Sequence, residues 1–297
     1  MLTPYKLQEN ITNNFGNDGR AWLEELPNLL KRITDEWQLT EIEQVANLSY
    51  NYVCTAYSAL FVQNIVCKLA CNAKDLQTEV NALNFYEGKT CVKLLAHNTL
   101  NKAICLERLS PATNLKTSFP SNEDEAIKIA VKVMQDLHNV PLVNPNNFPT
   151  ISDWLEELNM ISLVPEQHLA KAKLLKRRLF ATQEKQVLLH GDLHHENILQ
   201  SGSNWVVIDP KGVIGEIGYE VGVFIYNPIP ELLLAPDPKA IISRRIKLFS
   251  EILDIDMQRI CDLSYVRAIL SAVWCGESDK DGADYMLRVA EIIETIN

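Results

Sequence analysis

Short apolar segments separated by polar turns occupy the first hundred or so residues and predict a small β-sheet. They are rich in Val, Ile, Cys and Tyr, as is typical of strands, and they span residues 42–48, 52–58, 64–70, 90–96 and 102–107. Between the third and fourth of them, apolar residues recur at helical spacing and predict a helix over residues 74–86. For the polar opening of the chain, which contains Trp22 and Trp37, the pattern predicts no helix or strand.

From Ser110 onward, apolar residues at helical spacing dominate. Ser121 and the three carboxylates that follow it predict a helix start, because a hydroxyl can cap free N–H groups and negative charges face the positive end of the helix dipole. A stretch rich in Pro and Asn, residues 141–149, interrupts the pattern. Further helices are predicted over residues 152–160 and 168–180.

A β-rich island interrupts these helices. Its apolar segments predict strands over residues 186–190, 197–200 and 204–209. Ser201-Gly202-Ser203 is the tight turn between the last two. The whole pattern predicts an α+β chain with a small antiparallel-sheet lobe over residues 1–108 and a mainly helical lobe over residues 109–297.

The composition is that of an ordinary globular protein. Of 297 residues, 47% are apolar and 22% charged, which is enough to bury a sizeable core. The formal net charge of -10 argues against binding to nucleic acid and would suit a cationic ligand. No apolar run is long enough to span a membrane, and residues 1–14 lack the features of a secretory signal. The seven scattered cysteines indicate reduced core thiols, so we expect a cytoplasmic protein; its oligomeric state does not follow from the pattern.

The strongest candidate for chemistry is the run His-Gly-Asp-Leu-His-His-Glu-Asn at residues 190–197, followed by Asp209. The pattern places the carboxylates of Asp192 and Asp209 at the ends of two strands, with the Asn197 amide between them. If those strands are neighbours, the oxygens meet at one edge. A few hard oxygen donors suit Mg²⁺, which takes its other ligands from water and phosphate. Phosphoryl transfer needs little beyond that metal and a carboxylate that orients the attacking hydroxyl and accepts its proton.

Two other interpretations of this run stay open. His190, His194 and His195 could form a zinc site, since imidazole suits that metal, and the protein would then be a metal hydrolase. Alternatively, the carboxylates could be ordinary turn residues at strand ends.

Lys68 lies among apolar residues in the third predicted strand, where a charge is costly unless it is paired. Glu79 interrupts the apolar face of the following helix, so an ion pair between the two would satisfy both charges. Kinases use such a pair to hold the α- and β-phosphates of ATP. The alternatives are a strand-edge lysine with a solvated glutamate, or Glu87 as the partner.

The spacing His-x-Asp-x4-Asn followed by a strand-terminal Asp resembles the catalytic segment of the protein-kinase-like fold. More narrowly, the chain resembles the aminoglycoside/hydroxyurea resistance kinases, among them the streptomycin 6-kinases. The matching motifs run in order over most of the chain, at residues 48–53, 68–69, 106–109, 190–197, 208–216, 219–222 and 227–228. The resemblance implies a two-lobed kinase-like fold.

The same resemblance implies an enzyme that uses ATP and Mg²⁺ to phosphorylate a hydroxyl of a small molecule. Asp192 would be the catalytic base, and Asn197 and Asp209 would hold the metal. Lys68, paired with Glu79, would anchor the phosphates. The implied acceptor is an aminoglycoside such as streptomycin, which would connect the protein with antibiotic resistance. A sugar, an amino alcohol or hydroxyurea stays open as the acceptor, as do GTP in place of ATP and the hydroxyl that is phosphorylated.

Other parts of the nucleotide site are implied less directly. Ser49 and Asn51 lie where the family covers the phosphates, although the loop has no glycine, unlike that of protein kinases. Glu107 and Leu109 join the two lobes, where a kinase offers backbone groups to adenine. The missing glycine favours one rival, a catalytically inactive kinase fold that senses nucleotide.

For the acceptor, the pattern offers only candidates. Lys211 could contact phosphate or substrate, or be a surface lysine. Trp274 could be a stacking platform or a core residue. An acidic cluster could meet a cationic acceptor or be a solvated face, and it comprises Glu277, Asp279, Asp281 and Asp284.

Overall fold

The computed structural model describes residues 4–46, 48–160, 162–183, 185–276 and 279–296. The chain divides into two compact units, the first ending at Ser110 and the second beginning at Pro111. Within the described ranges, no helix is long and apolar enough to cross a membrane.

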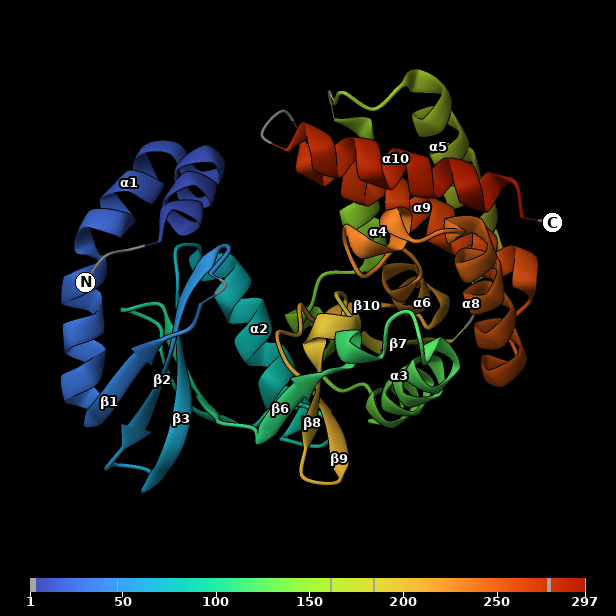
Figure 1. Ribbon diagram of the computed structural model, residues 1–297. Helices are drawn as coiled ribbons and strands as arrows, with labels where there is room; N and C mark the ends of the chain where they lie inside the picture. Colours follow the sequence, from blue (N-terminus) through green and yellow to red (C-terminus); the bar gives the residue numbers. More distant parts are fainter. Residues whose placement is uncertain (1–3, 47, 161, 184, 277–278, 297) are drawn as a thin grey trace. The chain divides into compact units, whose positions relative to one another are not determined.

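The first unit is built on a five-stranded antiparallel sheet with strand order β1-β2-β3-β5-β4. Figure 1 shows helix α1 on one side of this sheet and helix α2 on the other. The elements are α1 (Tyr5–Glu36), β1 (Leu39–Gln44), β2 (Asn51–Ser58), β3 (Gln63–Ala70), α2 (Ala73–Tyr86), β4 (Leu94–Asn98) and β5 (Ala103–Glu107). The predicted sheet and the helix between its third and fourth strands are therefore confirmed.

Helix α1 occupies the polar opening for which the pattern predicted no element. It buries a stripe of apolar side chains at helical spacing, including Trp22, Leu26, Leu29 and Ile33. Gly16 has a φ of 54° and places a kink near the start of the helix. The sequence thus contained a helical signal that its polar residues obscured.

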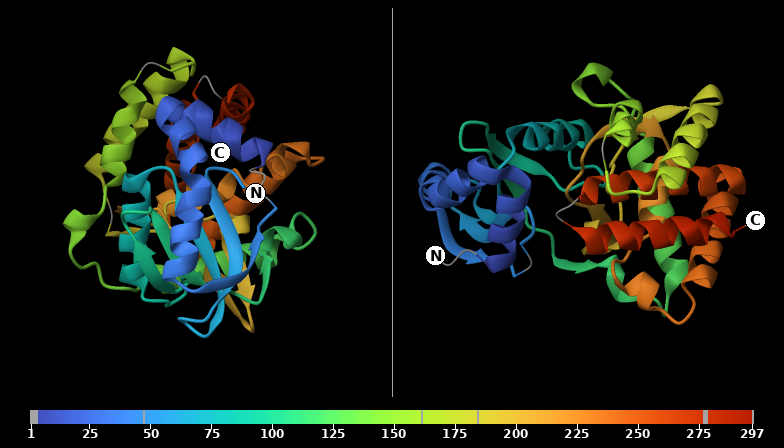
Figure 2. Two further views of the ribbon diagram at one scale, coloured as in Figure 1. Left: turned by 90° about the vertical axis from the view of Figure 1, so that its left-hand side faces the viewer. Right: turned by 90° about the horizontal axis from the view of Figure 1, so that it is seen from above.

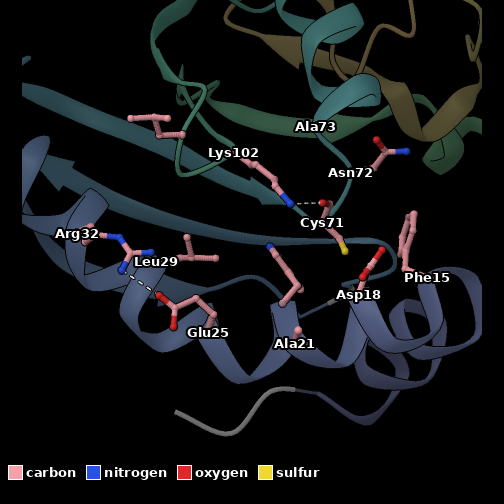
Figure 3. Close-up of a pocket in the computed structure, with 12 residues that line it drawn as sticks. Phe15, Asp18, Ala21, Glu25, Leu29, Arg32, Cys71, Asn72, Ala73 and Lys102 are labelled. Atoms are coloured by element: carbon pink, nitrogen blue, oxygen red, sulfur yellow. Dashed lines mark hydrogen bonds and ion pairs between the residues drawn. The ribbon is translucent and has the colours of Figure 1, made fainter.

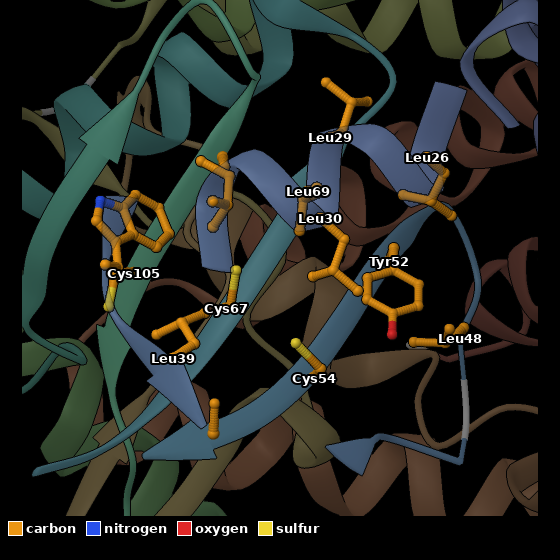
Figure 4. Packing of buried hydrophobic residues seen from close by; sticks show 14 of the residues in the cluster. Leu26, Leu29, Leu30, Leu39, Leu48, Tyr52, Cys54, Cys67, Leu69 and Cys105 are labelled. Atoms are coloured by element: carbon orange, nitrogen blue, oxygen red, sulfur yellow. The ribbon is translucent and has the colours of Figure 1, made fainter. Parts of the chain in front are cut away.

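The core of the first unit lies between α1 and one face of the sheet. Leu26 and Leu30 from the helix pack with Tyr52 and Leu69 from the strands (Figure 4). Because side chains alternate across a strand, Leu69 faces this core and Lys68 points to the opposite face, where α2 lies. The sheet therefore presents one buried lysine to α2.

Two strands differ in position from the prediction. β1 ends at Gln44, whereas the predicted strand ran over residues 42–48, a range that includes Asn47, which lies outside the described residues. A register shift between Thr40 and Glu43 breaks the regular alternation on which the prediction relied. β4 begins at Leu94 instead of Thr90, because Thr90 has a φ of 60°, which no extended strand adopts.

The second unit combines helices with two small antiparallel sheets, of strand order β6-β8-β9 and β10-β7. Its central helix α9 packs against α5, α6 and α10 (Figures 1 and 2). The strands are β6 (Pro111–Asn114), β7 (Gln186–Leu189), β8 (Ile198–Ser201), β9 (Asn204–Val207) and β10 (Val213–Glu216). The α-helices are α3 (Glu123–His138), α4 (Ile151–Leu155), α5 (Glu166–Ala181), α6 (Gly218–Ile225), α7 (Glu231–Leu234), α8 (Pro238–Leu253), α9 (Met257–Cys275) and α10 (Lys280–Glu294).

The β-rich island and the predicted helices are present in this unit, but the helix predicted over residues 152–160 is α-helical only over Ile151–Leu155 and continues as a 3₁₀-helix over Glu156–Asn159. Strands β6 and β10 were not predicted, because β6 contains Pro111 and Asn114 and β10 contains Gly215, residue types that are depleted in strands. Ser121 is not the cap of α3: Asn122 occupies that position, and its side chain makes no capping hydrogen bond. The carboxylates do lie in the first turn, as predicted.

Candidate functional site

The loop of residues 190–197 follows β7 and is tied by hydrogen bonds to the segment after β9. The His190 ring lies with Nε2 2.8 Å from the carbonyl oxygen of Ile208, and the Asp192 N–H donates to Nδ1 over 3.2 Å. The Ile208 N–H donates to the Asn197 carbonyl over 3.0 Å, and Asn197 Nδ2 donates to the Asp192 carbonyl over 2.9 Å. These bonds gather Asp192, Asn197 and the backbone that precedes Asp209 into one cluster.

The predicted route to this cluster was wrong. Strands β7 and β9 are not neighbours, because β7 pairs with β10 and β9 pairs with β8. β9 also ends at Val207, so Asp209 lies beyond the strand, at a φ of 58°. The link between the two strand ends is the His190 ring, which no strand pattern reveals.

The environment of Asp192 favours its ionised form. Burial alone would raise the pKa of this carboxyl, but its electrostatic interactions with His194, Lys211 and Arg267 outweigh burial and hold the pKa below its ordinary value. A carboxylate that is ionised at neutral pH can orient a hydroxyl and accept its proton. Burial also lowers the pKa of His190, so its ring is neutral and can donate from Nε2 while accepting at Nδ1.

The donor atoms at this cluster fit Mg²⁺. Asn197 uses its amide nitrogen for the Asp192 carbonyl, so the amide oxygen is its remaining ligand atom. Together with Asp209 it offers hard oxygen donors. Within the described ranges, no group of three or more His, Cys, Asp or Glu side chains could hold a metal ion. Two such donors leave most of a metal's shell to water and phosphate oxygens, as Mg²⁺ prefers.

The histidines do not form the alternative zinc site. Both ring nitrogens of His190 are engaged by backbone groups, and Nδ1 of His194 accepts from the Glu196 N–H over 3.3 Å. His195 stacks on Phe224 at a centroid distance of 3.9 Å. The three rings thus serve three different contacts.

Glu220 and Arg267 hold the peptide that precedes Asp192, and sequence reasoning did not assign either of them a role. The Glu220 carboxylate accepts the His190 N–H over 2.6 Å and the Gly191 N–H over 3.0 Å. Arg267 donates from Nη2 to the Gly191 carbonyl over 3.2 Å. Gly191 has a φ of +85°, a conformation that glycine adopts readily, and charged side chains bind both of its backbone polar groups.

In the first unit, Lys68 and Glu79 form the predicted ion pair. Lys68 Nζ lies 2.9 Å and 2.8 Å from the two carboxylate oxygens, and both side chains are buried. Glu87 is instead exposed and pairs with Lys89, which removes it as the alternative partner. A buried lysine held by a carboxylate is the arrangement that kinases use to position phosphates.

The other residues predicted for the nucleotide site have local structural contacts. The Ser49 carbonyl accepts from the Asn10 amide over 3.1 Å, and Asn51 begins β2 opposite Ala70. The Glu107 side chain accepts the Lys93 N–H over 2.8 Å at the end of β5. Leu109, which follows β5, is buried. Their assignment to the nucleotide site stays a prediction.

The residues predicted for the acceptor lie in the second unit and are mostly exposed. Lys211 is exposed beside the 190–197 loop, and its backbone N–H donates to the His190 carbonyl over 2.7 Å. Asp279 caps α10 and Asp281 lies in its first turn, which are ordinary structural roles for carboxylates. Glu277 lies outside the described residues. Trp274 is not a core residue, since 40% of it is exposed.

A groove of about 590 Å³ in the first unit contains none of the predicted site residues (Figure 3). It runs between α1 and the start of α2. Several of its charged groups bond other protein groups: Arg32 pairs with Glu25 over 2.9 Å, and Lys102 Nζ donates to the Cys71 carbonyl over 2.8 Å. We assign no ligand to this groove.

Comparisons with known proteins agree with the geometry. The family model for aminoglycoside/hydroxyurea antibiotic resistance kinases matches residues 55–279. The chain is 25% identical to the streptomycin 6-kinase of Streptomyces glaucescens over 282 residues, which cover 91% of this chain and 90% of that protein. It is 24% identical to the streptomycin 6-kinase of Streptomyces griseus, with the same two shares covered.

Solved structures share the fold. An aminoglycoside phosphotransferase, APH(4)-Ia, crystallised with ADP and hygromycin B, matches with a TM-score of 0.68 over 89% of this chain and 97% of that one, at 12% identity. The choline kinase LicA of Streptococcus pneumoniae matches with a TM-score of 0.65 over 92% and 99%, at 15% identity. These likenesses confirm the predicted kinase-like fold.

Proposed function

The chain belongs to the aminoglycoside/hydroxyurea antibiotic resistance kinase family, and we propose that it transfers the γ-phosphoryl group of ATP to a hydroxyl of an aminoglycoside such as streptomycin. The observation that carries this proposal is the hydrogen-bonded cluster of Asp192, Asn197 and the backbone before Asp209. It holds one carboxylate that can act as a base and two side chains that can bind a metal.

Each residue has a distinct role in this proposal. Asp192 accepts a hydrogen bond from the acceptor hydroxyl and takes its proton as the oxygen attacks phosphorus. Asn197 and Asp209 hold Mg²⁺, which when bound with ATP neutralises charge on the phosphate oxygens. Lys68, fixed by Glu79, contacts the phosphates of the nucleotide. Lys211 is exposed beside the loop and can reach phosphate or acceptor.

The ionisation state of Asp192 and the net charge of the chain support the assignment. The lowered pKa of Asp192 leaves it ionised at neutral pH, as a base must be. The acidic net charge of -10 suits an acceptor that carries ammonium or guanidinium groups.

The test is to incubate the purified protein and Mg-ATP with streptomycin, a neutral sugar, choline and hydroxyurea in parallel. ADP release and the phosphorylated acceptor, identified by mass spectrometry, are measured in each. We expect ADP release that depends on streptomycin and yields one phosphoryl group per acceptor. Thermal stabilisation by Mg-ATP without transfer to any acceptor would instead identify a nucleotide sensor, and transfer to another acceptor alone would overturn the aminoglycoside assignment.

A further inference from the structure

Trp274 is a fixed, partly exposed aromatic side chain at the end of α9. Its Nε1 donates to Glu157 Oε2 over 2.7 Å. Its ring meets Trp154 edge to face, at a centroid distance of 5.3 Å and an interplanar angle of 78°. The Arg267 guanidinium lies over the ring, 4.7 Å from its centroid. These contacts hold the indole in one orientation while 40% of the residue stays exposed.

Two of those neighbours connect Trp274 to the catalytic loop. Arg267 donates to the Gly191 carbonyl over 3.2 Å. Trp154 packs against the same residue so closely that a Cβ on Gly191 would lie 2.9 Å from Trp154 Cη2. Trp274 is therefore separated by a single layer of side chains from the peptide that leads into Asp192.

Such a placement needs an explanation other than core packing. Trp37 keeps 2% of its surface exposed and Trp22 keeps 5%, whereas Trp274 leaves a large apolar surface in water. Leaving that area exposed forgoes the free energy of burial, and the contacts to Glu157 and Arg267 prevent the ring from turning away. A rigid exposed aromatic near a catalytic carboxylate is suited to stacking on a ligand.

The charge on Arg267 indicates which ligand surface fits. A cation over one face of an aromatic ring is attracted by the negative charge of that face, and its field opposes a second cation on the other face. The exposed part of Trp274 is thus a poor host for an ammonium group and a better host for the C–H face of a saturated ring. Aminoglycosides consist of such rings.

We propose that Trp274 is a specificity-determining residue that stacks on the C–H face of a sugar or cyclitol ring of the acceptor, beside the hydroxyl that Asp192 deprotonates. This inference rests on the proposed function, because it assumes that the acceptor binds at the Asp192 cluster. It assigns to Trp274 acceptor binding alone, with no part in nucleotide binding.

The experiment compares Trp274→Ala and Trp274→Phe with the control Trp205→Phe, which alters a partly buried tryptophan on the β8–β9 hairpin of the same unit. We expect Trp274→Ala to raise the KM for streptomycin roughly tenfold, the scale of one lost aromatic stacking contact. The KM for ATP should stay within about twofold, Trp274→Phe should recover part of the loss, and the control should behave as the wild type.

The outcomes separate this inference from the proposed function. If the wild type phosphorylates streptomycin and both Trp274 variants keep its KM, the stacking role is wrong while the function stands. If the wild type does not turn over streptomycin, calorimetric binding of streptomycin to wild type and Trp274→Phe decides: weaker binding to the variant supports the inference, and equal or no binding overturns it. Competition by choline that depends on Trp274 would contradict the assignment to a C–H face.

Discussion

Glu220→Gln tests whether the buried carboxylate behind the 190–197 loop supports both folding and turnover. Glu220 is fully buried, and its two oxygens accept the N–H groups of His190 and Gly191 over 2.6 Å and 3.0 Å. Glutamine has the same shape but only one acceptor oxygen, so its NH₂ group must face one of the two donors. One charge-assisted hydrogen bond is lost and one buried N–H is left without an acceptor.

The size of the effect follows from these two changes. A hydrogen bond to a charged group contributes about 1.5–3 kcal/mol, and a buried unpaired donor costs about 1–3 kcal/mol. Removing a buried charge offsets part of this. We expect the free energy of unfolding to fall by about 2–4 kcal/mol, a large share of a typical domain's stability. We also expect kcat to fall at least about tenfold, because a shift of Gly191 misplaces Asp192.

The assay pairs urea unfolding with steady-state kinetics, and Glu216→Gln is the matched control. Glu216 is also buried, and its carboxylate pairs with Arg259 over 2.6 Å. The control should lose stability and keep kcat. The reasoning is refuted if Glu220→Gln costs less than about 1 kcal/mol, or if it loses stability and retains kcat as the control does.

Two further predictions concern the buried charges. Lys68→Met leaves Glu79 buried without its lysine and should lower the free energy of unfolding in urea by about 3–5 kcal/mol. The double variant Lys68→Met, Glu79→Leu should regain most of that stability without regaining turnover. Recovered turnover in the double variant would show that Lys68 has no role toward phosphate. Burial would raise the pKa of Glu220, but its interactions with the neighbouring His138 and His190 rings and with the Gly191 N–H outweigh burial and hold the pKa below its ordinary value of 4.5. The stability from its ionised form is therefore complete above about pH 4.5 and is lost as the pH falls through the lower folded-state value. Urea unfolding at several pH values should show the difference between wild type and Glu220→Gln shrinking below about pH 4.5, and a constant difference would contradict the assignment.

The sequence revealed the candidate residues of the site but not how the fold brings them together. Asp192, Asn197 and Asp209 can be identified in the sequence from their residue types and their spacing. How they meet is not visible, because the connection is made by the His190 ring reaching the Ile208 carbonyl. A hydrogen bond from a side chain to a distant backbone group depends on tertiary structure that strand patterns do not encode.

Glu220 illustrates the same limit. Glu220 is a charged residue within helix α6, whose residues are all buried, and a buried charge needs a partner. That much could have been read from the sequence. The partners could not be identified from the sequence, because they are the backbone N–H groups of His190 and Gly191, and every residue except proline carries such a group.

The sequence of helix α1 contains apolar residues at helical spacing, but residues unfavourable to a helix obscured this pattern. Trp22, Leu26 and Ile33 recur at helical spacing, but the segment is polar on average and contains Gly16 and Pro27, both unfavourable inside helices. Packing of the apolar stripe against the sheet overrides those local preferences.

The most direct test of the central claim is single-turnover transfer from Mg-ATP to streptomycin by wild type and Asp192→Asn, with ATP binding measured in parallel. The account predicts that the variant binds ATP as the wild type does, while transfer slows by about 10²–10⁴-fold, because asparagine cannot accept the hydroxyl proton. Transfer at the wild-type rate by Asp192→Asn would contradict it.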